Sequence, residues 1–396
     1  MSLSIRLGLA FLCVPGLAFA QHAGHATAPV AKPPKPTIAV GTQIDRQGRL
    51  WLASVENQRL WVRVSADGGK QFSAPVQVNA EPEQISADGE NRPKIAVAAD
   101  GTVLLSWTQA LPQNYSGNIR FSRSVDGGKT FSTPITLNDD GRITSHRFDS
   151  LMTDGQGRVV IAWLDARDRD AAKEKSSPYA GTSVYYTQSN DNGASFQPNR
   201  RLNEHNCECC RIAGTWSNEG PVVFWRNLYG TNTRDFAIAA LDTGVVRRAT
   251  DDEWQIDGCP HHGGGLATDP RGTLHLTWFT NGKTRQGLFY KRLAGANEST
   301  PLAFGNASAQ AGHPDVAVAG NQVVLTWREF SNNAYTAMAM RSDDGGVNWS
   351  APLRLAEAAG AADYPLPVSD GKRVWVVWNA MAEGVRVLPV ESGVEK

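Results

Sequence analysis

The sequence predicts an all-β protein, specifically a β-propeller of seven blades. Two series of residues predict this fold. A Ser-x-Asp-x-Gly-x-x-aromatic pattern occurs four times, and strand-like segments that end in tryptophan recur with a similar spacing. The composition agrees, because 38 Gly, 21 Pro and 12 Trp favour many strands and turns over long helices. Six blades with an additional sheet is the alternative interpretation.

The charge balance restricts the kind of partner. The chain has 396 residues, of which 39 are basic and 39 acidic, and this balance excludes binding to nucleic acid through bulk charge. Hydrophobic residues make up 41% and charged residues 20%, as in an ordinary globular protein with a packed core. The expected ligand is a small molecule, a glycan or a metal ion, and the expected state is a monomer.

Residues 1–20 have the pattern of a cleavable signal peptide. Arg6 precedes an apolar run from Leu7 to Leu17, and Ala18-Phe19-Ala20 is a small-x-small cleavage site. Residues 21–36, rich in Ala, Pro and His, are expected to form a flexible lead-in to a single propeller domain over 37–396. No later stretch reaches about 18 apolar residues. The mature protein is therefore expected to be periplasmic or secreted, without a membrane span.

Each copy of the serine–aspartate pattern is expected to be a hairpin turn. The Asp carboxylate can accept backbone N–H groups across the turn, and Gly supplies a positive φ. The aromatic ring is expected to cover the sheet edge. The copies are Ser65-Asp67-Gly69-Phe72, Ser124-Asp126-Gly128-Phe131, Ser189-Asp191-Gly193-Phe196 and Ser342-Asp344-Gly346-Trp349.

The tryptophan series sets the same period. Each tryptophan ends a strand-like run that follows a Gly turn, and the matching position of the first unit holds Ser54. Another apolar segment precedes each turn, so we expect seven units of about 50 to 60 residues with strands A, B, C and usually D. The seventh unit ends after strand C near Val390, and its outer strand is expected from the lead-in. The tryptophans are Trp107, Trp163, Trp225, Trp278, Trp327 and Trp378.

The four turns resemble the Asp boxes (BNR repeats) of the sialidase superfamily, and the resemblance covers essentially the whole mature chain. It implies that the boxes join strands C and D on the face opposite the active site and serve the structure. It also implies the residue types of a sialidase site. These are three arginines around a substrate carboxylate, a Tyr–Glu nucleophile pair and an Asp acid/base.

Candidate catalytic residues follow for the face formed by the D-to-A and B-to-C loops. Three arginines and a tyrosine directly precede a strand A, and two acidic residues follow a strand B. Three guanidinium groups can bind one carboxylate by bidentate hydrogen bonds. The Phe/Tyr-Arg-Ile-Pro motif of sialidases is absent, so we expect the constellation to be incomplete. The candidates are Arg92, Arg147, Arg211, Tyr364, Asp165 and Glu329.

A cluster of cysteines and histidines lies in the same loops. If these loops meet at the axial mouth of the propeller, they bring together thiolates and imidazoles, which are ligands of copper(I) and zinc(II). Copper is favoured because such ligands coincide with the expected export of the protein. The alternative is a set of disulfides, for example between the 207–210 segment and Cys259, and a mixed site is also compatible. The candidate ligands are Cys207, Cys209, Cys210, Cys259, His261, His262 and His313.

The sequence therefore leads to three hypotheses about function. The leading one is an exported, sialidase-like propeller with a metal-associated site, with copper favoured over zinc, at the axial mouth. The second is an exo-sialidase-type glycoside hydrolase that acts on an anionic sugar and needs no metal. The third is a non-catalytic binding propeller stapled by disulfides. The long charged loop from Asp165 to Gly181 is expected to be solvated or to act as a lid.

Overall fold

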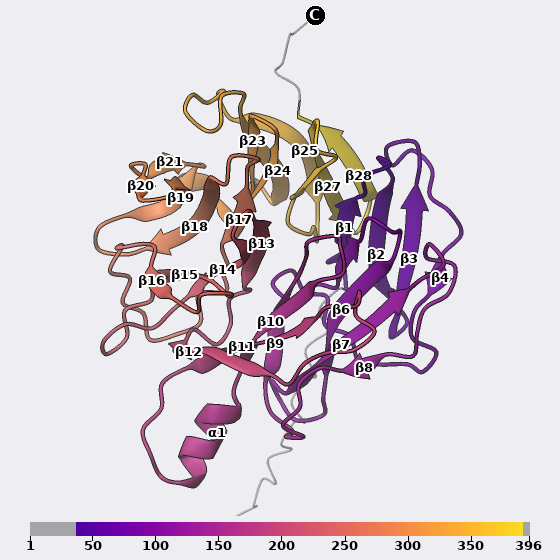
Figure 1. Ribbon diagram of the computed structural model, residues 1–396. Helices are drawn as coiled ribbons and strands as arrows, with labels where there is room; N and C mark the ends of the chain where they lie inside the picture. The colour runs from indigo at the N-terminus through magenta and orange to yellow at the C-terminus, as the bar shows by residue number, and fades with distance from the viewer. Residues whose placement is uncertain (1–36, 391–396) are drawn as a thin grey trace, which may run out of the picture. The chain divides into compact units, whose positions relative to one another are not determined.

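Seven antiparallel sheets follow one another along the chain in the computed structural model, which describes residues 37–390 (Figure 1). Within each sheet, consecutive strands pair as a meander from strand A outward. The first three blades comprise β1 (Gly41–Ile44), β2 (Leu50–Glu56), β3 (Arg59–Ser65) and β4 (Val76–Gln77); β5 (Lys94–Val97), β6 (Val103–Ala110), β7 (Gly117–Ser124) and β8 (Ile135–Thr136); and β9 (His146–Thr153), β10 (Val159–Asp165), β11 (Thr182–Ser189) and β12 (Arg200–Asn206).

The remaining four blades repeat the pattern with small variations. The fifth blade carries an additional short strand, and the seventh has three strands among the described residues. They comprise β13 (Ala213–Ser217), β14 (Gly220–Arg226), β15 (Phe236–Ala240) and β16 (Val246–Arg248); β17 (Gly265–Thr268), β18 (Leu274–Asn281), β19 (Gln286–Ala294), β20 (Asn297–Glu298) and β21 (Leu302–Phe304); β22 (Gly312–Ala319), β23 (Gln322–Ser331), β24 (Ala334–Ser342) and β25 (Leu353–Ala359); and β26 (Leu366–Ser369), β27 (Val374–Ala380) and β28 (Gly384–Pro389).

The seven blades close into a ring. Strand A of each blade contacts strand A of the next, and β26 of the last blade contacts β1 of the first. This confirms the predicted seven-bladed propeller and excludes six blades with an additional sheet. The predicted signal peptide and the lead-in strand expected to complete the seventh blade lie outside the described residues.

The tryptophans predicted from the repeat lie within strand B of their blades and are fully buried. The prediction that each ends its strand was only approximate. Strand β14 ends at Arg226, directly after Trp225, whereas β23 continues past Trp327 to Ser331. In the first blade, Trp51 of β2 is the buried tryptophan.

The four serine–aspartate turns connect strands C and D in blades one, two, three and six. In the turn at Ser124, the hydroxyl donates to Asp126 Oδ1 at 2.7 Å and accepts the Gly128 N–H at 2.8 Å. Asp126 Oδ1 also accepts the amides of Lys129 and Thr130, both at 3.0 Å. The same serine–glycine bond, at 2.8 Å, occurs in the other three turns.

The aromatic residue of these turns packs between blades and does not simply cover a sheet edge. The Phe196 ring of blade three lies edge-on to Phe121 of blade two, with 4.9 Å between ring centroids. The Trp349 ring of blade six meets Tyr290 of blade five in the same way, at 4.8 Å. The turns therefore help to hold neighbouring blades together.

Two short helices interrupt the sheets within residues 37–390. Helix α1 (Arg167–Glu174) lies in the charged loop between strands B and C of blade three, where only a loop was expected. A 3-10 helix, η1 (Ala307–Ala309), precedes β22. Among residues 37–390, neither helix is long and apolar enough to cross a bilayer.

Candidate functional site

Glu90 lies at the centre of the loops that lead into the innermost strands. Its Oε1 accepts a hydrogen bond from Arg211 Nη1 at 2.9 Å, and its Oε2 accepts the amide N–H groups of Arg211 and Gly263 at 3.0 and 2.9 Å. His313 Nδ1 lies 3.2 Å from Oε1. Glu90 precedes blade two, whereas its partners belong to blades four, five and six or the loops that enter them. The carboxylate therefore joins blades across the axis.

Glu90 is ionised despite its burial. Burial by itself raises the pKa of Glu90, but the Arg211 charge and the hydrogen bond with His313 outweigh it and hold the pKa below its ordinary value. Arg211 is in turn buried, and the Glu90 charge outweighs the effect of that burial and raises the Arg211 pKa. The two groups form a buried ion pair.

Two of the three candidate arginines already bind carboxylates of the protein. Arg211 is paired with Glu90, as described above. Arg92 Nη1 and Nη2 donate to the two carboxylate oxygens of Asp363 at 2.7 and 2.9 Å, and both side chains are buried. Arg147 makes no ion pair or side-chain hydrogen bond to another residue of the 37–390 region, and its guanidinium lies over the Phe148 ring. Burial lowers the Arg147 pKa. The three arginines therefore do not share a free carboxylate-binding point in this structure.

The candidate acidic residues Asp165 and Glu329 bind buried indole N–H groups. Trp163 Nε1 donates to Asp165 Oδ2 at 2.8 Å, and Trp327 Nε1 donates to Glu329 Oε1 at 2.8 Å. An oxygen acceptor for a buried indole is a structural requirement. The other blades meet it with the pairs Trp51–Asp45, Trp107–Glu83, Trp225–Asn206, Trp278–Asp252 and Trp378 with the Asp363 carbonyl.

A stack of four aromatic rings lies beside Glu90. Ring centroids are 4.2 Å apart for Phe279 and His262, 4.4 Å for His262 and His313, and 3.7 Å for His313 and Tyr364. Burial lowers the pKa of His262 to about 2 and that of His313 to about 4, so both imidazoles are neutral at pH 7. Burial also raises the Tyr364 pKa, and its hydroxyl forms no hydrogen bond to a carboxylate in the described part of the chain.

The loop that enters blade four brings three cysteine sulfurs together. Cys207 Sγ lies 3.8 Å from the sulfurs of both Cys209 and Cys210, and all three residues are buried. The three sulfur atoms lie within 4.8 Å of one another. All four cysteines of the described region are free thiols in this structure.

Cys209 also belongs to a second group. Its sulfur, the sulfur of Cys259 and a ring nitrogen of His261 lie within 4.8 Å of one another. Cys259 and His261 are exposed and come from the loop that enters blade five. The structure thus gathers five of the seven predicted metal ligands around Cys209, whereas His262 and His313 lie outside both groups, in the aromatic stack.

Cys207 is the cysteine of the cluster whose pKa is lowered. Hydrogen bonds from the thiols of Cys209 and Cys210, aided by nearby arginines, hold the pKa of Cys207 well below its ordinary value. Arg234 Nη1 lies 3.1 Å from the Cys207 sulfur. The hydrogen bond to Cys207 raises the pKa of Cys209, and burial raises that of Cys210.

Sequence reasoning missed Glu90 and Asp363 as site residues. Both lie at the same position as the candidate arginines, shortly before a strand A, and each binds one of them. Buried arginines require such partners. The available indication was that Glu90 lies two residues before Arg92 and Asp363 directly before Tyr364.

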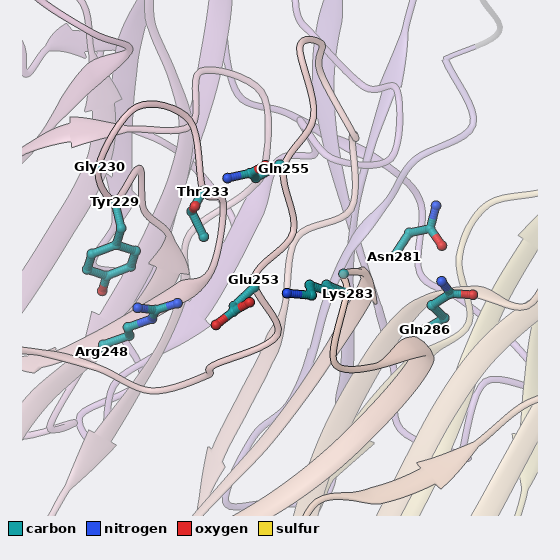
Figure 2. A pocket seen from close by; sticks show the side chains of 10 residues that line it. Tyr229, Gly230, Thr233, Arg248, Glu253, Gln255, Asn281, Lys283 and Gln286 are labelled. Carbon is teal, nitrogen blue, oxygen red and sulfur yellow. The ribbon is translucent and has the colours of Figure 1, made fainter.

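Two neighbouring cavities open on the face formed by the B-to-C and D-to-A loops. The first, of about 600 Å³, lies between blades four and five and has a polar lining that includes Tyr229, Arg248, Glu253 and Lys283 (Figure 2). The second, of about 780 Å³, lies between blades five and six and includes aromatic side chains. Both cavities are lined by Asn281 and Gln286.

No family model matches the chain, and no curated protein matches it. Solved structures resemble its fold. An α-L-arabinanase from Penicillium chrysogenum, in complex with arabinobiose, has 15% identity and a TM-score of 0.51, covering 74% of this chain and 89% of the enzyme. A mutant α-L-arabinofuranosidase from Fusarium graminearum, in complex with an iminosugar inhibitor, has 15% identity and a TM-score of 0.53, covering 78% and 95%.

A third similar structure is an ulvan lyase bound to an oligosaccharide. It has 12% identity and a TM-score of 0.52, covering 89% of this chain and 94% of the lyase. At such low identity these similarities establish the propeller fold alone. The membership of the sialidase superfamily expected from the four turns stays a prediction.

Proposed function

We propose that this chain is an exported propeller that binds copper(I) at its axial mouth through the cysteine cluster. The observation that carries the proposal is the position of Cys209, whose sulfur belongs to two groups of potential ligands. One group adds the sulfurs of Cys207 and Cys210, and the other adds Cys259 and His261. The Cys209 sulfur is therefore shared between a group of three sulfurs and a group of two sulfurs and one imidazole nitrogen.

The chemistry of these donors favours copper(I) over zinc. Thiolates are soft ligands, and copper(I) accepts two or three of them, whereas a structural zinc site requires four ligands in a tetrahedron. Cys207 and Cys210 are buried and Cys259 is exposed, so the site has a dry side and an open side. Arg234 beside the Cys207 sulfur stabilises thiolate charge there. This arrangement suits binding and transfer of an ion at the mouth.

Copper(I) titration of the reduced full chain against a chromophoric chelator tests the proposal. Cys209→Ser removes the sulfur shared by both groups and is expected to weaken copper binding by roughly 100-fold, because a thiolate ligand is lost. His261→Gln is expected to weaken it less. His205→Gln is the matched control, since His205 is also an exposed histidine with a positive φ, 59° against 53° for His261. Equal affinity in wild type and Cys209→Ser would contradict the proposal.

Disulfide formation is the competing use of the same cysteines. Thiol titration of the denatured, unreduced protein distinguishes the two. A copper site predicts four reactive thiols in the mature chain, whereas a propeller stapled by disulfides predicts two or none. Zero reactive thiols in protein isolated from its native compartment would replace the copper proposal with a stapled binding module.

Carbohydrate binding in the two cavities between blades four, five and six is a second candidate function. It is supported by the two adjoining cavities, which suit an extended ligand, and by the carbohydrate ligands named for the three similar propellers. Phe330 and Tyr335 in the second cavity offer rings for sugar stacking, and Lys283 offers a cation for an acidic sugar. The proposal does not include sialoside hydrolysis, because Arg92 and Arg211 are paired within the protein.

Calorimetric titration with arabinan and ulvan oligosaccharides tests this second function. Tyr335→Ala is expected to weaken binding by about tenfold, the loss of one stacking contact of about 1.4 kcal/mol. Tyr115→Ala is the matched control, because Tyr115 is 82% exposed and lines neither cavity. Absence of binding for both glycans would remove support for these two ligand classes, and equal binding by both variants would place the ligand elsewhere.

A further inference from the structure

We infer that the cavity between blades five and six has a subsite for an acidic sugar, in which Arg328 binds the sugar carboxylate and His313 accepts a hydrogen bond from a sugar hydroxyl. Both side chains line this cavity. They come from β22 and β23, neighbouring strands of blade six whose register pairs Gly312 with Arg328. The inference rests on the proposed carbohydrate binding and narrows its ligand class. It is independent of the proposed copper binding.

Arg328 has a guanidinium without a carboxylate partner. It forms no ion pair with another residue of the 37–390 region, whereas Arg92, Arg211 and Arg248 are each paired. Its Nη1 donates to the Ala362 carbonyl at 2.8 Å, and no hydrogen bond within the described residues uses Nε or Nη2. The Nε–Nη2 edge of a guanidinium is one of the edges that bind a carboxylate through two parallel hydrogen bonds. Arg328 therefore offers this edge to a ligand.

Two tyrosine rings hold the Arg328 guanidinium in place. Its Cζ atom lies 4.3 Å from the centroid of the Tyr335 ring and 4.9 Å from that of the Tyr364 ring. Such contacts stabilise an arginine charge and leave it available to an anion. Because the guanidinium is already oriented, a ligand that binds to it loses little affinity to side-chain ordering.

The hydrogen bond with Glu90 sets the tautomer of His313. The ionised carboxylate can only accept, so His313 Nδ1, at 3.2 Å from Glu90 Oε1, carries the proton. Burial lowers the pKa of His313 to about 4, and the neutral ring at pH 7 has its lone pair on Nε2. Nε2 has no hydrogen-bond partner among residues 37–390 and is not enclosed by them. It is thus an acceptor at the cavity wall, which suits a hydroxyl donor.

The carboxylate of Glu329 does not compensate Arg328, although it lines the same cavity. Successive side chains of β23 point to opposite faces of the sheet, so these two residues lie on different sides of the strand. Glu329 Oε1 accepts the Trp327 indole N–H and the Asn306 amide at 2.8 and 2.9 Å. Two donors therefore stabilise the Glu329 charge, and no carboxylate of the described chain does the same for Arg328.

Ulvan oligosaccharides provide the probe, because they contain glucuronate and sulfated rhamnose. Chemical reduction of their carboxyl groups to alcohols removes the carboxylates and keeps the sulfates. Calorimetric titration of the full wild-type chain is expected to show that the native form binds roughly tenfold or more tightly than the reduced form, since a charge-assisted hydrogen bond is lost. This comparison uses the wild-type protein alone and does not depend on the folding of a variant.

Substitution of Arg328 locates the effect. Arg328→Gln is expected to abolish the difference between the native and reduced forms, and Arg328→Lys to retain part of it, because lysine keeps the charge without the fork. Arg373→Gln is the matched control. It removes the same charge from an exposed arginine between β26 and β27 that lines neither cavity, and it is expected to retain the wild-type difference.

The nitrogen resonance of His313 Nε2 reports the second contact in the wild-type protein. It is expected to shift when the native oligosaccharide is added, whereas the resonances of His275, which is fully buried in blade five, are expected to stay unchanged. An unshifted His313 resonance at saturation would overturn its role as an acceptor.

Equal wild-type affinity for the native and reduced forms would overturn the carboxylate subsite. If arabinan oligosaccharides still bind and Tyr335→Ala weakens that binding, the carbohydrate function stands without the subsite, whereas no binding of either glycan would remove both. Equal weakening of both ulvan forms in Arg328→Gln would also overturn the inference, because the sulfate group would then be the anion bound by Arg328.

Discussion

Glu90 Oε1 and Arg211 Nη1 lie 2.9 Å apart in a pair that joins blade two to blade four across the mouth of the propeller. The same carboxylate accepts the Gly263 amide and contacts His313, so four of the seven blades meet at one side chain. The pair occupies the arginine that would otherwise be free to bind a ligand carboxylate. Its role is to hold the ring together at the axis.

Glu90→Gln is expected to destabilise the fold by about 3 to 5 kcal/mol, because it leaves the buried Arg211 charge uncompensated. Urea unfolding monitored by tryptophan fluorescence measures the free energy of unfolding. Glu357→Gln is the matched control. It breaks the exposed ion pair with Arg354 and is expected to change the stability by less than about 1 kcal/mol. A Glu90→Gln protein as stable as that control would contradict the axial role.

The serine of each serine–aspartate turn is expected to contribute to stability. Ser124 is 1% exposed, and Ser124→Ala removes one bond to Asp126 and one from the Gly128 amide. The expected loss is about 1 to 3 kcal/mol in the free energy of unfolding. Ser177→Ala, at an exposed serine in the loop after α1, is the control and is expected to be neutral. Equal unfolding midpoints would show that the turn tolerates loss of the hydroxyl.

Substitutions of Glu329 test whether this residue is a structural hydrogen-bond acceptor or a catalytic acid. Its Oε1 accepts both the Trp327 indole N–H and the Asn306 amide. Glu329→Gln retains an acceptor oxygen and is expected to keep stability within about 1 kcal/mol, whereas Glu329→Leu leaves both donors unpaired and is expected to cost about 2 to 4 kcal/mol. The two variants are compared by thermal unfolding, and equal losses in both would indicate that the charge, not the acceptor, is needed.

Stability is expected to fall as the pH drops through the range in which unfolded histidine gains its proton. Burial lowers the pKa of His275 to about 4, and its Nδ1 lies 2.7 Å from the Tyr290 hydroxyl. The unfolded state therefore binds a proton near pH 6.5, and the contribution of His275 is complete above that pH and is lost progressively down to about pH 4. His275→Gln cannot titrate. The loss of stability between pH 7 and pH 5 is expected to be about 2 kcal/mol smaller in this variant than in wild type.

The free energy of unfolding of both proteins is measured with urea at each pH, so that the contributions of the other titrating groups cancel in the difference. Identical pH dependence in wild type and variant would show that the His275 imidazole has the same pKa in the folded and unfolded states.

The propeller could be predicted because its evidence is local and periodic. Each turn such as Ser65 to Gly69 and each buried strand containing a tryptophan occupies a few consecutive residues, and their spacing gives the number of blades. The axial contacts could not be predicted in this way. Glu90, Arg211 and His313 are separated by over a hundred residues each, and no periodic pattern indicates which carboxylate binds which arginine.

The positions of the candidate metal ligands could also be predicted only in part, even for residues next to each other in the sequence. The sequence indicated that cysteines and histidines converge at the mouth, and the structure places Cys209, Cys259 and His261 together there. His261 and His262 are consecutive, yet the first is exposed beside the sulfurs and the second is stacked inside. His261 has a φ of 53°, which separates the directions of the two side chains, and such a backbone conformation at a non-glycine residue is rarely predictable from sequence.

The most direct test of the copper site is X-ray absorption at the copper edge on the reduced, copper(I)-loaded wild-type protein. Binding around Cys209 predicts a first shell dominated by two or three sulfur atoms at about 2.3 Å, and the sulfur count is expected to fall in Cys209→Ser. A first shell of nitrogen and oxygen alone, at about 2.0 Å, or protein that retains no copper after removal of excess metal, would contradict the proposed site.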